Sequence, residues 1–274
     1  MPNDKLILLT NDDGIRSPGL WAAAHALEPL GWVVVAAPRT QWSGAGRSLP
    51  NDSTGRIHAE QVQVNDESWT VHAVEGTPAQ AVQHAVLQLL PRLPDLAVSG
   101  INYGENVGSG VTISGTVGAA LEAASLGIPA LAVSLETDKA YHLSHSDEID
   151  FTTAAHFTRL FAERLMTRAL PFDVDALKIE IPADATPDTP WQMTRLSRQR
   201  YYAPVKPERV HLADPGPIGY DREIDYARLE PDSDVQALAV ARVVSVTPLS
   251  LDLTSRVDLG ELGKLLLPPH RPGL

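Results

Sequence analysis

Short unbroken runs of apolar residues recur along the chain and alternate with longer segments of a different pattern. The runs lie within residues 6–9, 32–36, 95–98 and 130–134, and such runs are typical of strands buried on both faces in a parallel sheet. Several segments between them repeat apolar residues every three or four positions, as one face of a helix does. This alternation predicts an α/β fold, with a mainly parallel sheet flanked by helices.

Proline and capping residues mark where the helices begin. Ser17 precedes Pro18 and Thr77 precedes Pro78, and a capping residue followed by proline is typical of the first turn of a helix. Ser114 begins a further segment of small residues. Helices are therefore predicted at about residues 18–30, 78–90, 114–126 and 151–170.

Two other regions alternate apolar and polar residues, which predicts strands with one wetter face. The first flanks Asn65-Asp66 and predicts an antiparallel hairpin. In the second, residues 177–181, Lys178 and Glu180 occupy the wetter face. A late strand and a terminal helix are predicted at residues 243–246 and 259–267.

Residues 201–226 are rich in proline, glycine, tyrosine and charge, a composition typical of a long loop or protruding arm. Such arms tend to exchange between protomers. We therefore expect a single α/β domain with a core at about residues 4–185 and an arm and oligomerisation segment at about residues 195–274. A homodimer or homotetramer is expected, with the C-terminal arm exchanged between subunits.

The amino-acid composition limits which metal ligands and which binding partners are expected. The 274 residues contain no cysteine, so any metal must bind through oxygen or histidine. The nine histidines show no metal-binding spacing and are interpreted as scattered structural or surface residues. A net charge of −12 disfavours a nucleic-acid polymer or a membrane as partner. Because no membrane span or signal peptide is evident, a cytoplasmic location is expected.

The first apolar run ends in a pair of acidic residues, Asp12 and Asp13. Adjacent side chains in a strand point to opposite faces, so the two carboxylates can face one ion only if the strand has ended, and Gly14 permits that turn. Ligands of open α/β sheets collect at the carboxyl ends of strands, where a hard divalent cation would relieve the repulsion between the carboxylates. The alternative is that residues 11–14 form only a turn.

Three further segments are expected to end at the same edge of the sheet. Ser43 offers a neutral oxygen and Gly44 a close backbone approach, and Asn102 offers an amide oxygen after a buried strand. The helix start at residues 114–116 offers free N–H groups to an anion. Each also has a plain structural interpretation, as a surface loop, an Asx turn or a helix cap respectively.

Five motifs along the chain carry a family resemblance. They are Leu8-Leu-Thr-Asn-Asp-Asp-Gly14 with Ser17-Pro-Gly-Leu20; Ala37-Pro38 with Ser43-Gly44 and Ser48-Leu49; Gly76-Thr-Pro-Ala79; Ser99-Gly-Ile-Asn102 with Gly104 and Asn106; and Ser114-Gly-Thr-Val-Gly118. In this order they resemble the SurE family of survival proteins, which have metal-dependent 5′-nucleotidase activity. A later segment, Val244-Ser-Val-Thr-Pro-Leu249 with Asp252-Leu-Thr254, is also similar to that family.

The resemblance implies a Rossmann-like core and assigns the site residues. It implies one divalent metal ion per subunit, Mg²⁺ or Mn²⁺, bound by Asp12, Asp13, Ser43 and Asn102. Binding of the substrate and its phosphate is assigned to Asn11, Gly44, Asn106, Ser114, Gly115 and Thr116.

The expected function is hydrolysis of nucleoside 5′-monophosphates, small-molecule substrates, to nucleoside and phosphate. The family's breadth would add 3′-nucleotides and short polyphosphate. The metal would polarise the phosphoryl oxygens and lower the pKa of a water. Asp12 and Asp13 are the candidate catalytic residues; Asp12 leads as the group that orients or deprotonates this water, and the choice between them stays open.

The chain departs from the family's usual residues at a few positions. Arg39 stands in place of Asp, Gln80-Ala81 in place of Asp-Cys, Ile113 in place of Tyr and Arg242 in place of Gly. None of these is a proposed metal ligand. Arg39 and Ile113 are expected to flank the pocket, so they bear on substrate preference.

Two alternative functions share parts of this pattern. A haloacid-dehalogenase-type phosphatase needs a second carboxylate two positions after its nucleophile, whereas Asp12 and Asp13 are adjacent. A receiver-like signalling domain that binds magnesium needs a phosphoacceptor Asp at the end of a central strand, and the strand ending at Val98-Ser-Gly100 supplies none.

Overall fold

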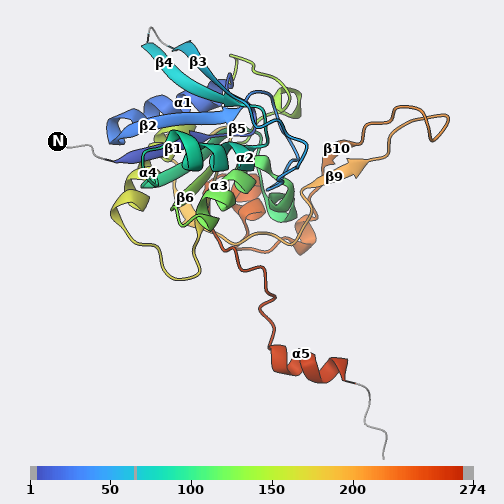
Figure 1. Ribbon diagram of the computed structural model, residues 1–274. Helices are drawn as coiled ribbons and strands as arrows, with labels where there is room; N and C mark the ends of the chain where they lie inside the picture. The colour runs from blue at the N-terminus through green and yellow to red at the C-terminus, as the bar shows by residue number, and fades with distance from the viewer. Residues whose placement is uncertain (1–4, 65–66, 268–274) are drawn as a thin grey trace, which may run out of the picture.

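A nine-stranded sheet forms the centre of the molecule (Figure 1). The structure is a computed structural model that describes residues 5–64 and 67–267. The strands lie in the order β3-β4-β2-β1-β5-β6-β7-β11-β8. They are β1 (Leu6–Thr10), β2 (Trp32–Pro38), β3 (Ile57–Val64), β4 (Glu67–Val74), β5 (Leu96–Tyr103), β6 (Ala130–Leu135), β7 (Ala176–Ile181), β8 (Trp191–Met193) and β11 (Val244–Leu249). From β4 to β7 every neighbouring pair is parallel, which confirms the mainly parallel sheet.

Helices cover both faces of this sheet. Successive side chains of a strand point to opposite faces, and in β1 Ile7 and Leu9 join one apolar cluster whereas Leu8 joins another. The first cluster includes buried residues of α1 (Pro18–Leu27) and α4 (Thr152–Thr167), and the second includes those of α2 (Pro78–His84) and α3 (Gly115–Ser125). The α/β fold class predicted from the sequence is confirmed.

The strand predicted at residues 95–98 is longer than its apolar run. β5 continues to Tyr103, and its register against β6 shifts between Ser99 and Asn102. Asn102 therefore lies within the strand, which corrects the prediction that it follows the strand. Such an irregularity redirects side chains at the end of a strand, and here it lies beside the end of β1.

A second correction concerns β7. Lys178 and Glu180 were predicted on a wetter face, but both side chains have no exposed surface. Their charged groups meet each other and Asp234 instead of water. Alternation of polar and apolar residues shows which side chains share a face, but it does not show whether that face reaches solvent.

The predicted arm is a two-stranded antiparallel hairpin, β9 (Tyr202–Val205) with β10 (Gly219–Arg222). It extends away from the main sheet (Figure 1). The predicted core boundary near residue 185 is wrong, because β8 and β11 follow that residue and complete the main sheet.

The remaining predicted elements lie at the two ends of the fold. β3 and β4 form the predicted antiparallel hairpin, and its turn residues Asn65 and Asp66 lie outside the described residues. The terminal helix, α5 (Leu259–Leu266), stands apart from the sheet (Figure 1). In the described part of the chain, no helix is both long and apolar enough to cross a membrane.

Candidate active site

A cavity of about 400 Å³ lies beside the carboxyl ends of β1 and β5. Its walls come from the end of β1, the loop after β2, the segment between β5 and α3, and the arm. The residues that line it include Asp12, Ser43, Gly44, Asn102, Asn106, Ile113, Ser114, His142, Tyr202, Ile218 and Tyr220. Segments distant in sequence thus converge at the edge of the sheet where α/β proteins bind ligands.

β1 ends in a tight turn. The Asn11 Oδ1 atom accepts a hydrogen bond from the Gly14 N–H at 3.2 Å, and the Asn11 amide nitrogen donates to the Gly14 carbonyl oxygen at 3.1 Å. Gly14 has a φ of +100°, a conformation that favours glycine. Asn11 therefore holds the turn and does not line the cavity. The turn interpretation holds for Asn11 and Gly14, but it leaves the two aspartates unexplained.

Asp12 and Asp13 are 4% and 1% exposed, and different elements hold them. The Asp12 Oδ1 atom accepts a hydrogen bond from the Thr116 hydroxyl of α3 at 2.5 Å. Asp13 accepts hydrogen bonds from the Tyr103 N–H of β5 at 3.1 Å and from the Gln41 side-chain amide at 3.0 Å. Asp12 lines the cavity, whereas Asp13 does not.

Neither carboxylate has a cationic partner in the part of the chain that the structure describes. Burial raises the pKa of Asp12 to about 6, although the Thr116 hydroxyl opposes this effect. Burial, and then the neighbouring charge of Asp12, raise the pKa of Asp13 well above its ordinary value. Within residues 5–64 and 67–267, no lysine or arginine pairs with either group. Two adjacent buried carboxylates are costly to ionise together unless a cation joins them.

The start of α3 is packed against Asp12. A Cβ atom added at Gly115 would lie 2.7 Å from the Cβ and Oδ2 atoms of Asp12, so the close approach requires glycine. The backbone N–H groups of Gly115 and Thr116 help to lower the pKa of Asp12. Ser114 caps the helix by accepting a hydrogen bond from the Val117 N–H at 3.1 Å. Of residues 114–116, only Ser114 lines the cavity.

The loop that carries Ser43 and Gly44 is fastened beside the same helix. The Gly46 N–H donates to the Ile113 carbonyl oxygen at 2.9 Å. A Cβ atom at Gly118 would collide with the Gly46 backbone, so the absence of a side chain there lets the loop lie against α3. Ser43 and Gly44 are themselves exposed and reach the cavity wall.

Both asparagines predicted for the site line the cavity. The Asn102 amide nitrogen donates to the carbonyl oxygens of Tyr103 at 3.2 Å and Gly104 at 2.7 Å. This local bonding is the alternative raised from the sequence, and it leaves the amide oxygen as the atom available to a ligand. The Asn106 amide nitrogen donates to the Ser134 hydroxyl at 3.0 Å, which orients the Asn106 amide in the same way.

The donor set fits a divalent metal ion. Asp12, Ser43 and Asn102 line the cavity, so one carboxylate and two neutral oxygens face it. The Asp13 carboxylate accepts a hydrogen bond from the N–H of Tyr103, which also lines the cavity. Among the described residues, no group of three or more His, Asp or Glu side chains is arranged as a metal site. A cation here would therefore need the neutral oxygens as well as the carboxylates, and mixed oxygen donors suit Mg²⁺ and Mn²⁺.

The sequence did not predict an aromatic wall of the cavity or a contact of His145 with the acidic pair. The rings of His142 and Tyr220 are stacked with centroids 6.1 Å apart, and Tyr202 packs edge-on against both. The His145 Nε2 atom is 2.9 Å from the Asp13 carbonyl oxygen. The histidines are interpreted from the sequence as scattered structural or surface residues; in the structure His142 lines the cavity and His145 contacts the turn that carries Asp13. The tyrosines within residues 201–226 were the available signal for the wall.

The departures from the family pattern fall in different places. Arg39 does not line the cavity, contrary to expectation; it pairs with Glu75 at 3.3 Å. Ile113 does line the cavity and is 63% exposed. Gln80 completes a capping box at the start of α2. Arg242 has a φ of +54°, which accounts for glycine as the usual residue there.

Comparison with known proteins covers nearly the whole chain. The model of the family described as "Survival protein SurE" matches residues 7–203. The chain is 44% identical to a protein named 5′-nucleotidase SurE from Thermococcus gammatolerans, over 95% of both chains. It is 41% identical to a protein of the same name from Thermococcus kodakarensis, over 95% of this chain and 98% of that one. A crystal structure of the SurE protein from Aquifex aeolicus is similar with a TM-score of 0.74 and 32% identity, over 95% of this chain and 99% of that one.

Proposed function

The chain belongs to the SurE family, and from this membership we propose that it is a 5′-nucleotidase that hydrolyses nucleoside 5′-monophosphates in the cavity at the end of β1. One divalent cation per subunit, Mg²⁺ or Mn²⁺, supports the reaction. We extend the proposal to 3′-nucleotides and short polyphosphate as further substrates. Membership of the SurE family favours this activity over a dehalogenase-type phosphatase and over a receiver-like signalling domain.

The observation that carries the proposal is the pair of buried carboxylates at the cavity. Asp12 and Asp13 are nearly inaccessible and lack a cationic partner among the described residues. A structural role alone would not favour this arrangement, because each buried charge raises the cost of the other. A bound cation and an anionic substrate explain why both are kept.

Asp12 is the residue that we assign to the attacking water. It lines the cavity, whereas Asp13 does not, and a base must be within hydrogen-bond reach of the proton that it accepts. The Thr116 hydroxyl and Gly115 fix its carboxylate. When bound, the divalent cation neutralises charge on the phosphoryl oxygens and makes the attacking water more acidic.

The phosphate is assigned to the wall beside Asp12. Ser114 at the N-terminus of α3, Asn106 and Gly44 all line this part of the cavity. The positive end of the α3 dipole favours an anion there. Because the N–H groups of Gly115 and Thr116 already approach Asp12, their part in the site is to hold this carboxylate, and Ser114 is the nearer group for a phosphoryl oxygen.

The nucleoside is assigned to the aromatic wall. The aromatic residues His142, Tyr202 and Tyr220 line the cavity together with Ile218. Any nucleobase can stack on an aromatic ring, whatever hydrogen-bonding groups it carries at its edge. Base stacking of this kind tolerates all four common bases. The proposal therefore predicts a broad preference among nucleoside monophosphates.

The arm formed by β9 and β10 is the basis for a proposal about the oligomeric state. Tyr202 and Tyr220 belong to β9 and β10, so the arm contributes to the cavity. Beyond these strands, Val210 and Leu212 are 87% and 92% exposed. We propose a homodimer or homotetramer in which the arm passes to another subunit, and a monomeric mass by light scattering at micromolar concentration would contradict it.

The activity is tested by phosphate release from AMP. Protein dialysed against EDTA should be inactive, and addition of Mg²⁺ or Mn²⁺ should restore release of both adenosine and phosphate. Full activity in EDTA would contradict the metal requirement. Failure to hydrolyse AMP with either metal, or with a panel of divalent ions, would contradict the nucleotidase assignment.

A further inference from the structure

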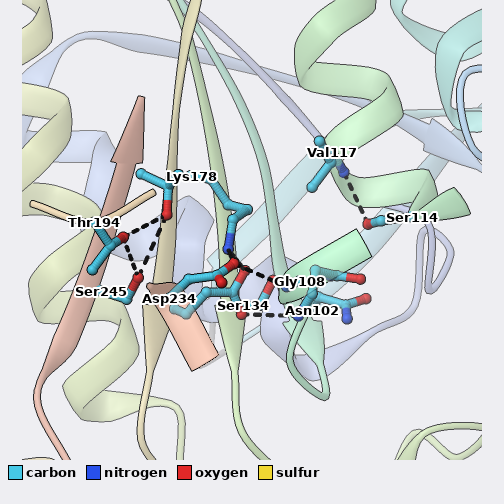
Figure 2. Close-up of polar contacts among 12 residues, drawn as sticks. Asn102, Gly108, Ser114, Val117, Ser134, Lys178, Thr194, Asp234 and Ser245 are labelled. Atoms are coloured by element: carbon cyan, nitrogen blue, oxygen red, sulfur yellow. Dashed lines mark hydrogen bonds and ion pairs between the residues drawn. The ribbon is translucent and has the colours of Figure 1, made fainter. Parts of the chain in front are cut away.

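A cluster of three fully buried charged residues lies next to the cavity, outside the residues assigned to the reaction. The Lys178 ammonium nitrogen is 3.2 Å from Glu180 Oε1 and 3.1 Å from Asp234 Oδ2, and none of the three side chains has exposed surface. Lys178 and Glu180 come from β7, and Asp234 comes from the segment before β11. Figure 2 shows the Lys178 side chain pointing toward Asp234.

The two carboxylates of this cluster also hold the cavity wall. Glu180 Oε2 accepts a hydrogen bond from the Asn106 N–H at 2.9 Å. Asp234 Oδ2 also accepts one from the Gly108 N–H at 3.0 Å. The cluster is thus hydrogen-bonded to the backbone on both sides of Val107, in the segment where Asn106 lines the cavity.

The Asn106 side chain is oriented from the same side. Its amide nitrogen donates to the Ser134 hydroxyl at 3.0 Å, and Ser134 lies at the end of β6, the neighbour of β7 in the sheet. The backbone of Asn106 is therefore fixed by Glu180 and its side chain by Ser134. Together they determine where the remaining amide atom points in the cavity.

Stability does not explain why this cluster is charged. Removing three charges from water costs several kcal/mol per ion, and apolar residues of similar volume often stabilise a protein as well or better. Burial opposes the charge of Lys178, but the charges of Glu180 and Asp234 outweigh it and hold the pKa of the ammonium group above its usual value. Lys178 is therefore charged. Burial raises the pKa of Glu180 to about 7, although the charge of Lys178 and the hydrogen bond from the Asn106 N–H oppose this effect. The Glu180 and Asp234 side chains accept hydrogen bonds from the two loop N–H groups.

We propose that Lys178, Glu180 and Asp234 are positioning residues for the nucleotidase reaction, and that they act by fixing Asn106 against the substrate phosphate. None of the three touches the substrate. Lys178 holds the two carboxylates, and the carboxylates hold residues 106 and 108. The inference rests on the proposed function, because it assigns Asn106 to the substrate.

A double-mutant cycle tests this proposal. Glu180→Gln keeps the size of the side chain but cannot accept from both Lys178 and the Asn106 N–H. It should lower kcat for AMP by about tenfold, equivalent to about 1.4 kcal/mol, within the range of coupling between contacting residues. Asn106→Ala keeps the backbone N–H but removes the amide. If Glu180 acts through that amide, adding Glu180→Gln to Asn106→Ala should lower kcat little further.

The control is a buried polar cluster in the same region. Thr194 Oγ1 lies 2.8 Å from Ser245 Oγ and 2.7 Å from Thr247 Oγ1, and these contacts do not involve the cavity wall. Thr194→Val should lower the melting temperature as a buried polar change does, but leave kcat for AMP unchanged. Mn²⁺ affinity, measured by titration, should stay at the wild-type value in both Glu180→Gln and Thr194→Val.

The outcomes separate the two proposals. Wild-type protein that fails to release phosphate from AMP overturns the proposed function, and the inference fails with it. With active wild type, a full tenfold loss from Glu180→Gln in the Asn106→Ala background would show that Glu180 does not act through Asn106. Wild-type kcat in Glu180→Gln would also overturn the inference. A reduced loss in that background, with Mn²⁺ affinity retained, supports it.

Discussion

Replacing Asp12 with Asn should stabilise the metal-free protein at neutral and higher pH. Asp12 is buried, and its pKa is raised from 3.8 to about 6. This difference corresponds to roughly 3 kcal/mol of cost in the folded state once the group is ionised. Asn keeps the size of the side chain without the charge, and the Thr116 hydroxyl that contacts Asp12 can rotate to donate or accept. The same change removes the charge that raises the pKa of Asp13.

The pH dependence has a definite sign. In the unfolded chain, Asp12 loses its proton near pH 3.8, whereas in the folded protein it does so near pH 6. The folded state therefore binds more protons between these values, and the free energy of unfolding falls as pH rises through this window. Below the unfolded pKa the cost is absent, and above about pH 6 it is complete.

The assay is thermal unfolding in EDTA at about pH 4 and pH 8. For a domain of this size, 1 kcal/mol corresponds to roughly 2–4 °C, so Asp12→Asn should melt about 6–12 °C above wild type at pH 8 and close to it at pH 4. Asp95 is the opposite control: burial acts to raise its pKa, but hydrogen bonds from the Leu6 N–H and nearby cations hold it at about 2, so Asp95→Asn should melt lower at pH 8. An Asp12→Asn protein no more stable than wild type at pH 8 would refute the reasoning.

Three further predictions concern the cavity walls. Gly115→Ala should displace the Asp12 carboxylate and lower kcat for AMP by about tenfold or more. Gly110→Ala should keep wild-type activity, because a Cβ atom there meets nothing within 4 Å. Equal activity of the two variants would contradict this prediction. Ser114→Ala should lower kcat by roughly 10²-fold if its hydroxyl meets developing charge, with Mn²⁺ affinity retained; wild-type turnover would remove Ser114 from the phosphate site. Tyr220→Ala should raise KM for AMP but not for p-nitrophenyl phosphate; equal changes would show that the ring does not hold the nucleoside.

Local patterns were sufficient to predict the acidic end of β1. An apolar run predicts a buried strand, and Asn11 and Gly14 predict the turn that follows it, because these signals lie within a few residues of one another. The family resemblance then supplied a role for Asp12 and Asp13. The resemblance could not show that both polar atoms of the Asn11 side chain are hydrogen-bonded to the backbone of Gly14.

Features that depend on distant contacts escaped the sequence analysis. The alternation around Lys178 was interpreted as a solvated face, because nothing in residues 177–181 shows that Asp234 supplies a buried partner. Asn102 was placed after its strand, because the register shift in β5 arises from pairing with β6. Tyr220 and His142 meet across 78 residues, a contact that no local pattern encodes.

The most direct test of the account is the binding of Mn²⁺, followed by electron paramagnetic resonance, to wild type and Asp13→Asn protein. Asn preserves the volume and turn propensity of Asp but removes one negative ligand. We expect one Mn²⁺ bound per wild-type chain and much weaker binding to Asp13→Asn, with AMP hydrolysis lost in parallel. Equal Mn²⁺ binding and equal AMP hydrolysis by the two proteins would show that Asp13 is only a turn residue and would contradict the proposed metal site.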